Sequence, residues 1–201
     1  MINLTIYGDS ISTITHGGGG YIKRLKKSSI YQSIKSYAIS GSGLSSITPN
    51  NLYTIICKDY KIPVNTNWFL IWHGTNDWFY GSKIEQFESE LQTILDQLKT
   101  TCPNSQIIYL LPLYRYETPY GSSAPGNAFE TKNCVGLTLL DYRQSILNLL
   151  IKNKIDYLDM TTLTKTFQND VKQYYEDMVH PNSNGMDVIA QIINQYFTSK
   201  L

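Results

Sequence analysis

The chain has 201 residues, of which 42% are hydrophobic and 16% are charged, and its formal net charge at pH 7 is +1. This length and composition predict a single globular domain, residues 1–201, with enough apolar side chains for a substantial core. A net charge so close to zero argues against a dedicated binder of polyanions. We therefore expect no nucleic-acid partner.

The cysteines and histidines argue against a fold held together by disulfides or by a bound metal. Cys57, Cys102 and Cys134 form no CxxC pair, and none of the three histidines stands at metal-ligand spacing. We expect no disulfide framework, no metal and no cofactor, and free thiols suit a reducing compartment. No basic segment precedes the short apolar stretch 2–7, and no run reaches the roughly 18 apolar residues of a membrane span. The sequence thus predicts cytoplasmic synthesis without a signal peptide and without a membrane span, which leaves room for later extracellular release.

Short apolar runs alternate with helical periods along the chain. Five runs predict strands, at 2–7, 33–39, 68–73, 106–113 and within 155–160. Helices are predicted between and after them, within 21–27, 50–60, 83–101, 136–153 and 182–200. The last helix is expected to begin at a cap formed by Asn182 or Asn184. The polar segment 114–133 has no period and predicts an ordered surface loop, and the sequence does not decide whether it closes over a ligand.

This alternation of strands and helices predicts an α/β fold. Parallel strands need crossover connections, so the helices should cover both faces of a parallel sheet. Ligands of such sheets bind at the carboxyl ends of the strands. Three segments, 8–10, 40–43 and 73–77, are therefore expected to lie on one rim.

The residues on this rim suit nucleophilic catalysis. A serine nucleophile needs a base within hydrogen-bond reach, an acid that orients the base, and donors for a developing oxyanion. His180 can accept the proton of Ser10, and Asp177, three residues before it, can reach the same imidazole. The backbone N–H groups of Ser10 and Gly41 and the side-chain amide of Asn76 can converge on one oxygen.

Four short motifs carry a resemblance to a known family. They are "GDS" near the start, a glycine after the second strand, "GTND" after the third strand, and "DxxHP" near the end, and they span residues 8–181. In this order they resemble the four blocks of the SGNH (GDSL-type) hydrolases. The resemblance implies a flavodoxin-like, three-layer α/β/α sandwich with a five-stranded parallel sheet. It also implies a serine ester hydrolase.

The resemblance assigns roles residue by residue. It implies a triad of Ser10, Asp177 and His180, and an oxyanion hole formed by Ser10, Gly41 and Asn76. "SGSG" also offers Gly43 as a rival to Gly41, and the spacing of "AISGS" favours Gly41. Asp9 and Asp77 are expected to hold their turns by hydrogen bonds and not to act in catalysis.

The substrate contacts are predicted from side chains near the rim. The aromatic residues of the loop, with Arg115 and Tyr116 among them, form either ordinary loop packing or a substrate wall opposite Trp78 and Phe79. Rings with polar tips suit sugar faces, and Arg115 suits a carboxylate or hydroxyls. We take as candidate substrate-binding residues His73, Trp78, Arg115 and Tyr116. His73 has an alternative role as a core histidine.

His16 precedes four glycines (17–20) that predict a flexible lip beside Ser10. We expect it not to act as the base, because no acid stands near it in the sequence.

The predicted activity is hydrolysis of a small acyl ester, with acetyl on a carbohydrate as first choice, because the rim is rich in tyrosine and lacks a long apolar flap. The expected partner is thus a small-molecule or glycan ester, and the sequence makes no prediction of oligomeric state. Three alternatives remain: a lysophospholipase or thioesterase of the same family, a non-catalytic binding module of a larger assembly, and a flavin or phosphate binder that uses "DSIST" as its anion loop.

Overall fold

The computed structural model describes residues 1–119 and 126–201, which form a sheet of five parallel strands in the order β2-β1-β3-β4-β5. The strands are β1 (Ile2–Gly8), β2 (Tyr31–Ser36), β3 (Trp68–Trp72), β4 (Gln106–Leu110) and β5 (Asp156–Leu158). This order is that of flavodoxin-like doubly wound sheets. It confirms the predicted fold class.

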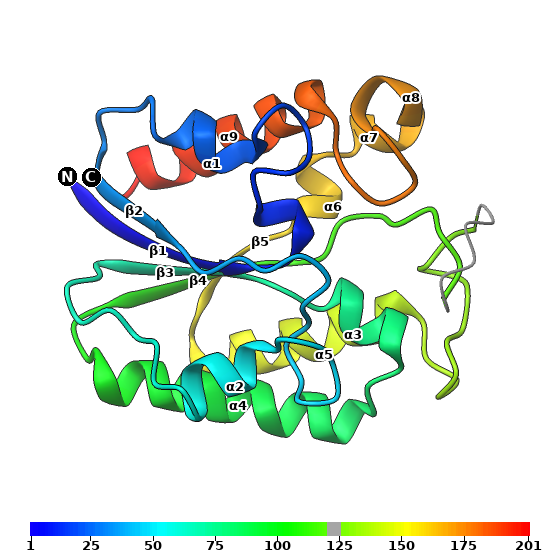
Figure 1. The fold of residues 1–201 in the computed structure, drawn as a ribbon, viewed down its shortest axis with the longest axis horizontal. Coiled ribbons are helices and arrows are strands. Elements are labelled where there is room, and N and C mark those ends of the chain that lie inside the picture. The colour runs from blue at the N-terminus through cyan, green and yellow to red at the C-terminus, as the bar shows by residue number, and fades with distance from the viewer. Residues whose placement is uncertain (120–125) are drawn as a thin grey trace.

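Helices cover both faces of the sheet and complete the three-layer sandwich seen in Figure 1. One layer contains α1 (Gly20–Leu25), α6 (Met160–Leu163), α7 (Thr166–Asn169), α8 (Val171–Tyr174) and α9 (Ser183–Thr198). The other contains α2 (Leu52–Cys57), α3 (Thr75–Tyr80), α4 (Ile84–Thr101) and α5 (Leu139–Asn153). Each layer buries a separate apolar cluster against its face of the sheet. No helix of the described residues is long and apolar enough to cross a membrane.

The central strands read as continuous apolar runs because both of their faces are covered. All five residues of β3 are buried, whereas β2 at the edge has none that is fully buried. The predicted strand 33–39 is displaced, since β2 begins at Tyr31 and ends at Ser36. The chain nevertheless stays beside β1 after Ser36, because the N–H groups of Tyr37 and Ile39 donate to the carbonyls of Ile6 and Gly8.

The helices α5 and α9 begin where polar side chains satisfy their first N–H groups, whereas α4 begins without a side-chain cap. At α9 the cap is Asn182, whose side chain accepts from the N–H of Gly185 at 3.2 Å, and this decides between the two predicted caps. At α5 a reciprocal capping box joins Thr138 and Asp141. The prediction missed α3, α6, α7, α8 and a 3-10 helix, η1 (Ser10–Ser12). All but α3 have only three or four residues, which are too few to show a period.

The predicted loop 114–133 is described at 114–119 and 126–133, and Tyr120 lies outside the described residues. The rings of Tyr114 and Phe129 stack with their centroids 4.3 Å apart. Asn133 is buried and joins this segment to two helices: its amide donates to the carbonyl of Trp78 in α3 and to the hydroxyl of Tyr142 in α5. The end of the loop is thus packed onto α3 and α5, while its start contacts the segment before α9, where the N–H of Tyr116 donates to the carbonyl of Met178.

Candidate active site

The carboxyl end of β1 turns directly into η1 and presents Ser10. Asp9 caps this short helix, and its buried carboxylate accepts the N–H of Ile11 at 3.0 Å. Gly8 has to be glycine, because a Cβ there would lie 2.3 Å from the Oγ of Ser12. The turn leaves the side chain of Ser10 at the end of the strand with 7% of the residue exposed.

The segment between α8 and α9 brings a histidine onto that hydroxyl. The isolated bridge between Tyr175 and Pro181 closes the segment into a compact turn. Within it, the Oδ1 of Asp177 accepts the N–H groups of Val179 and His180 at 2.7 and 2.6 Å. Local hydrogen bonds therefore fix the carboxylate beside the imidazole.

Two hydrogen bonds join three of the predicted residues in a chain. The Nε2 of His180 lies 2.8 Å from the Oγ of Ser10, and its Nδ1 lies 2.7 Å from the Oδ2 of Asp177. Ser10 and His180 are 170 positions apart in the sequence, and the fold alone brings them together. The arrangement can move a proton from the hydroxyl to the imidazole while the carboxylate orients the ring.

The pKa values in this chain suit a neutral imidazole beside an ionised carboxylate. Burial lowers the pKa of His180 below its ordinary value, and the hydrogen bond and charge of Asp177 oppose that only in part. For Asp177, burial acts to raise the pKa, but the hydrogen bonds from His180 and Val179 outweigh it and leave the pKa lowered. His180 is therefore free to accept a proton under mildly acidic conditions.

The sequence offers Gly41 and Gly43 as rival donors for an oxyanion, and the structure distinguishes them. Gly41 has a φ of +74°, a conformation that favours glycine, and a Cβ there would meet nothing within 4 Å. No described residue accepts the backbone N–H of Gly41 or of Ser10. Gly43 differs, because its N–H donates to the Oγ1 of Thr48 at 3.0 Å. The geometry therefore favours Gly41 over Gly43 as a donor.

Asn76, in the first turn of α3, is held by contacts to both ends of its amide. Its Nδ2 donates to the carbonyl of Ser42 at 2.8 Å, and its Oδ1 lies 3.4 Å from the Nη1 of Arg115. Arg115 is itself buried, ion-paired with Glu117, and stacked 4.4 Å from the ring centre of Phe79. These contacts leave one N–H of the amide available on the cleft side.

Two buried aspartates support the turns around these groups. The carboxylate of Asp77 accepts the N–H groups of Leu44 and Ser45 at 2.8 Å each, and that of Asp9 caps η1. Burial raises the pKa of both carboxyls, to about 7 for Asp9. Their hydrogen bonds bear on the backbone and not on a reacting atom.

A single cleft of about 410 Å³ lies beside Ser10, His180 and the candidate oxyanion donors Gly41 and Asn76. It is lined by Ser10, Ser40, Gly41, Asn76, Phe79, Tyr80, Arg115, Glu117, Asp177, Met178, Val179 and His180. The hydroxyl, the imidazole and the donors thus face the same space.

The family follows from the sequence pattern. A model of the GDSL-like lipase/acylhydrolase family matches residues 6–188. The chain belongs to this family. It is therefore a serine ester hydrolase, as its motifs predicted.

Solved structures show the same fold at low sequence identity. A protein from Lactobacillus plantarum aligns with a TM-score of 0.80 at 19% identity, over 100% of this chain and 98% of its own. A member of the lipolytic G-D-S-L family from Veillonella parvula aligns at 0.71 and 16%, over 98% and 99%. An acetylxylan esterase from Geobacillus stearothermophilus aligns at 0.68 and 16%, over 98% and 94%. No curated protein matches the chain.

Of the four predicted substrate contacts of this GDSL-family hydrolase, only Arg115 lines the cleft. Trp78 does not, because it is fully buried beneath α3 and its Nε1 donates to the carbonyl of Thr131 at 3.2 Å. Tyr116 packs edge-on against Tyr175, away from the cleft lining. The six residues of α3 are too few to show a hydrophobic period, so the sequence did not reveal whether Trp78 faces the cleft or the core.

His73 is a core residue and not a rim residue. It is 3% exposed, its backbone carbonyl accepts the hydroxyl of Tyr109, and its ring does not line the reactive cleft. Burial lowers its pKa to about 3, against a hydrogen bond with the backbone of Ser42. His73 therefore lies in the core and not in the lining of this cleft, which fits its alternative role as a core histidine.

His16 lies much closer to the reactive groups than its sequence position suggested. Its ring stacks on that of His180, and its Nδ1 is bonded to the carboxylate of Glu176. No acid stands near His16 in the sequence, as stated above, and the acid that the fold places beside it, Glu176, lies 160 positions away. No sequence signal connects two such distant residues, since only the fold pairs their segments.

His16, Asp177 and His180 also offer three potential metal ligands within 4.8 Å of one another. A metal bound by two imidazoles lies near the plane of both rings, along their nitrogen lone pairs. The two rings here are parallel to within 4° and stacked 3.6 Å apart, so their planes do not meet near the cluster. The arrangement does not suit an ion shared by the two histidines.

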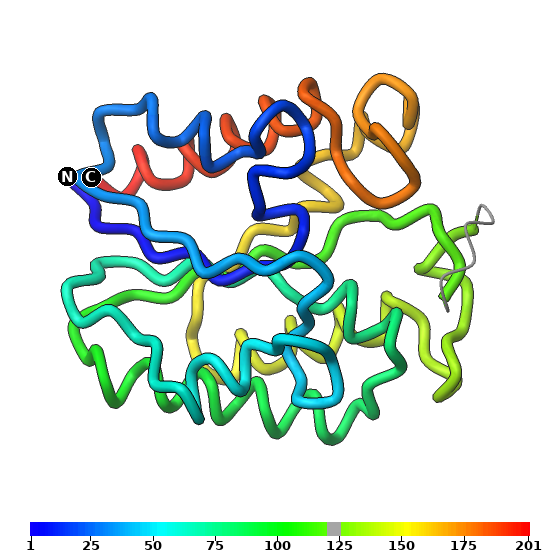
Figure 2. Tube along the Cα trace, in the orientation of Figure 1, coloured from blue at the N-terminus to red at the C-terminus, as the bar shows by residue number. Residues whose placement is uncertain are grey.

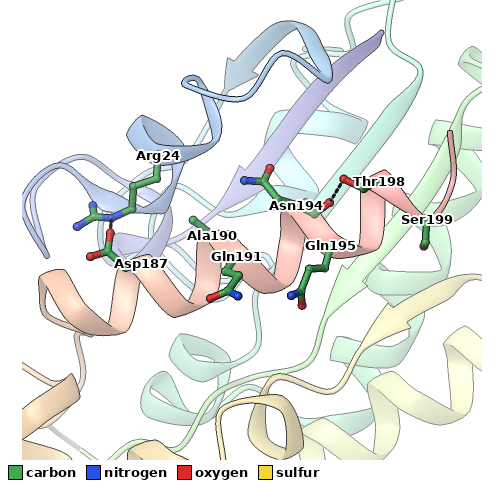
Figure 3. A pocket seen from close by; sticks show the side chains of 8 residues that line it. All are labelled: Arg24, Asp187, Ala190, Gln191, Asn194, Gln195, Thr198 and Ser199. Carbon is green, nitrogen blue, oxygen red and sulfur yellow. Dashed lines mark hydrogen bonds and ion pairs between the residues drawn. The ribbon is translucent and has the colours of Figure 1, made fainter.

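A more voluminous groove, of about 630 Å³, lies between α1 and α9 (Figure 3). The one cation on its lining, Arg24, is paired with Asp187, and the hydroxyl of Thr198 donates to the carbonyl of Asn194 within the helix. No histidine lines it. No hydroxyl in this groove is therefore hydrogen-bonded to a histidine of its lining, whereas Ser10 in the smaller cleft is hydrogen-bonded to His180.

Proposed function

We propose that this hydrolase works by acyl transfer through Ser10, with His180 as general base and Asp177 as the acid that orients it. The observation that carries the proposal is the continuous pair of hydrogen bonds from the hydroxyl to the imidazole and on to the carboxylate, at 2.8 and 2.7 Å. The lowered pKa values of His180 and Asp177 support these roles.

In the proposed reaction, the Oγ of Ser10 attacks the ester carbonyl while His180 removes its proton. The carbonyl oxygen becomes an oxyanion, which accepts hydrogen bonds from the N–H groups of Ser10 and Gly41 and from the amide of Asn76. His180 then gives the proton to the leaving alkoxide, so that an alcohol departs and an acyl-enzyme remains. Water attacks that ester with His180 again as base, which releases the acid and restores Ser10.

For the substrate we propose a small acyl group, with acetyl on a carbohydrate as first choice. The cleft presents Phe79 and Tyr80 beside the polar pair of Arg115 and Glu117, a combination of ring faces and hydrogen-bonding groups that suits sugars. The similarity in fold to an acetylxylan esterase supports the same choice.

The test is hydrolysis of p-nitrophenyl esters from acetate to octanoate, followed by acetate release from acetylated xylan. Ser10→Ala should remove turnover, at least 10⁴-fold, because the nucleophile is lost. It should leave folding intact, since the Oγ contacts only the imidazole of His180. Ile14→Ala, at a residue 76% exposed on the following loop, is the matched control.

Each outcome decides something. Acetate activity that depends on Ser10 supports acyl transfer, and acetate release from xylan supports the carbohydrate. A preference for octanoate would replace acetyl with a long acyl chain and favour the lysophospholipase or thioesterase alternative. A folded protein that neither turns over any ester nor reacts with a fluorophosphonate would contradict the proposal and favour a binding module.

A further inference from the structure

A second histidine–carboxylate pair lies directly against the first. The rings of His16 and His180 are stacked with their centroids 3.6 Å apart and their planes 4° from parallel. The Nδ1 of His16 is hydrogen-bonded to the carboxylate of Glu176, and the Nδ1 of His180 is hydrogen-bonded in the same way to that of Asp177. The two carboxylates are consecutive in the sequence, so one turn supplies both pairs.

The backbone holds His16 in this place. Figure 2 shows the segment before α1, in blue, beside the segment before α9, in orange. The N–H of Gly17 donates to the Oε2 of Glu176 at 2.9 Å. Gly17 has a φ of +55°, and a Cβ there would lie 2.4 Å from the side chain of Met186 and 2.9 Å from the carbonyl of Pro181. Only glycine lets the two segments approach so closely.

The stack covers one face of an imidazole that is otherwise attached only at its edges. The hydrogen bonds of His180 to Ser10 and Asp177 lie in the ring plane and permit tilting about the line between the two nitrogens. A parallel ring at van der Waals distance opposes that tilt. We propose that His16 is a positioning residue of the proposed reaction: its ring holds the imidazole of His180 between Ser10 and Asp177, and Glu176 holds His16.

The same arrangement bears on charge. When His180 takes the proton of Ser10 it becomes an imidazolium, faced by the carboxylates of Asp177 and Glu176, by the ring of His16, and by Arg115 across the cleft. A neutral ring stabilises a cation on its face, whereas a protonated His16 would repel it. Glu176 adds negative charge that favours the imidazolium.

The inference rests on the proposed function, and three variants test it by the hydrolysis of p-nitrophenyl acetate. His16→Ala removes the stacked ring and should lower kcat roughly tenfold while KM stays within about twofold, the scale expected for loss of one aromatic stack. His16→Phe restores a ring without the hydrogen bond and should recover most of kcat. Glu176→Gln keeps an acceptor but loses the charge, so the acid limb of kcat/KM should move to lower pH.

The controls make each failure specific. A kcat for His16→Ala equal to that of Ile14→Ala would overturn the proposal, as would a His16→Phe variant no better than His16→Ala. An unchanged acid limb in Glu176→Gln would remove the charge effect assigned to that residue. A role in folding alone would lower the melting temperature and leave the pH profile in place.

The NMR chemical shifts of the histidine ring protons separate this inference from the proposed function, because measuring them needs no turnover. In the wild type, the ring protons of His180 should show the upfield shift of a stacked ring, and His16→Ala should abolish it. If the wild type hydrolyses nothing but this shift is present, the proposed function fails and the stack stands. If the shift is absent, the positioning role is overturned.

Discussion

The two sides of the active site are built in different ways. Ser10 and Asn76 stand at the carboxyl ends of β1 and β3, with 7 and 8% of each residue exposed. Asp177 and His180 stand on the turn between α8 and α9, and their side chains are 47 and 17% exposed. The first side rests on the sheet, while the second is held by hydrogen bonds within one turn and by a neighbouring loop.

This difference predicts that substitutions on the two sides affect stability and turnover to different degrees. Changes on the buried side disturb hydrogen bonds that lack water to replace them, so they should lower both stability and rate. Changes on the exposed side are compensated by solvent and should affect the rate alone. Asp177→Asn, Asn76→Ala and Asp9→Asn test this division, and the pH dependence of the rate tests the state of His180 on the exposed side.

The largest effect is expected from Asp177→Asn. The amide cannot stabilise the imidazolium and favours the wrong tautomer, which should lower kcat by about 10⁴. Because the side chain is half exposed, the melting temperature should change little. Steady-state kinetics and thermal unfolding measure the two quantities. A large loss of stability with a modest loss of rate would show that this turn is structural and would break the comparison.

Asn76→Ala should lower both quantities. Loss of one oxyanion donor costs on the order of 10²–10³ in kcat. The buried carbonyl of Ser42 also loses its donor, which should cost roughly 1–3 kcal/mol of unfolding free energy. Denaturant unfolding beside the kinetics measures the second effect. A near-normal rate would exclude the amide of Asn76 from the oxyanion hole.

The pH at which activity is lost on acidification should lie below the ordinary pKa of a histidine. Catalysis needs neutral His180, and burial lowers its pKa below the ordinary 6.5 in spite of Asp177. Activity should therefore persist as the pH falls through 6.5 and be lost only at a lower pH. A profile of kcat/KM against pH locates the limb. A limb above 6.5 would mean that Asp177 dominates over burial.

The smallest effect on turnover is expected from Asp9→Asn, whose amide can still accept the N–H of Ile11. Burial raises the pKa of Asp9 from 3.8 to about 7 in the folded chain. Its protonated form is thus favoured by folding, and the stability it contributes is present below pH 3.8 and lost as the pH rises to 7. Thermal unfolding of the wild type should weaken across this window more than that of Asp9→Asn. Identical slopes would show that Asp9 is ionised throughout.

Sequence patterns predicted what repeats along the chain. β3 was predicted from a run of five consecutive apolar residues, which is typical of a strand covered on both faces. α4 was predicted from the helical period of its 18 residues. Ser10, Asp177 and His180 were predicted together because four motifs occur in family order. The pairing of His16 with Glu176 was not, because it depends on how two distant loops meet.

Substrate contacts were the least predictable part of the site. Whether Trp78 faces the cleft or the core depends on the rotation of α3, a helix of six residues that follows Gly74, whose φ is +121°. Neither fact has a signature in the local sequence. The burial of His73 was weighed correctly as an alternative because a continuous apolar strand precedes it.

The hydrogen bonds of Asn133 set a boundary for protein engineering. Asn133 ties the end of the 114–133 segment to α3, the helix that carries Asn76, although it does not line the cleft itself. Arg115 and Glu117 make a similar attachment at the start. Replacement segments from other hydrolases should therefore begin after Glu117 and end before Asn133. Grafts within these limits would keep both attachments, while grafts beyond them would displace the group proposed to receive the oxyanion.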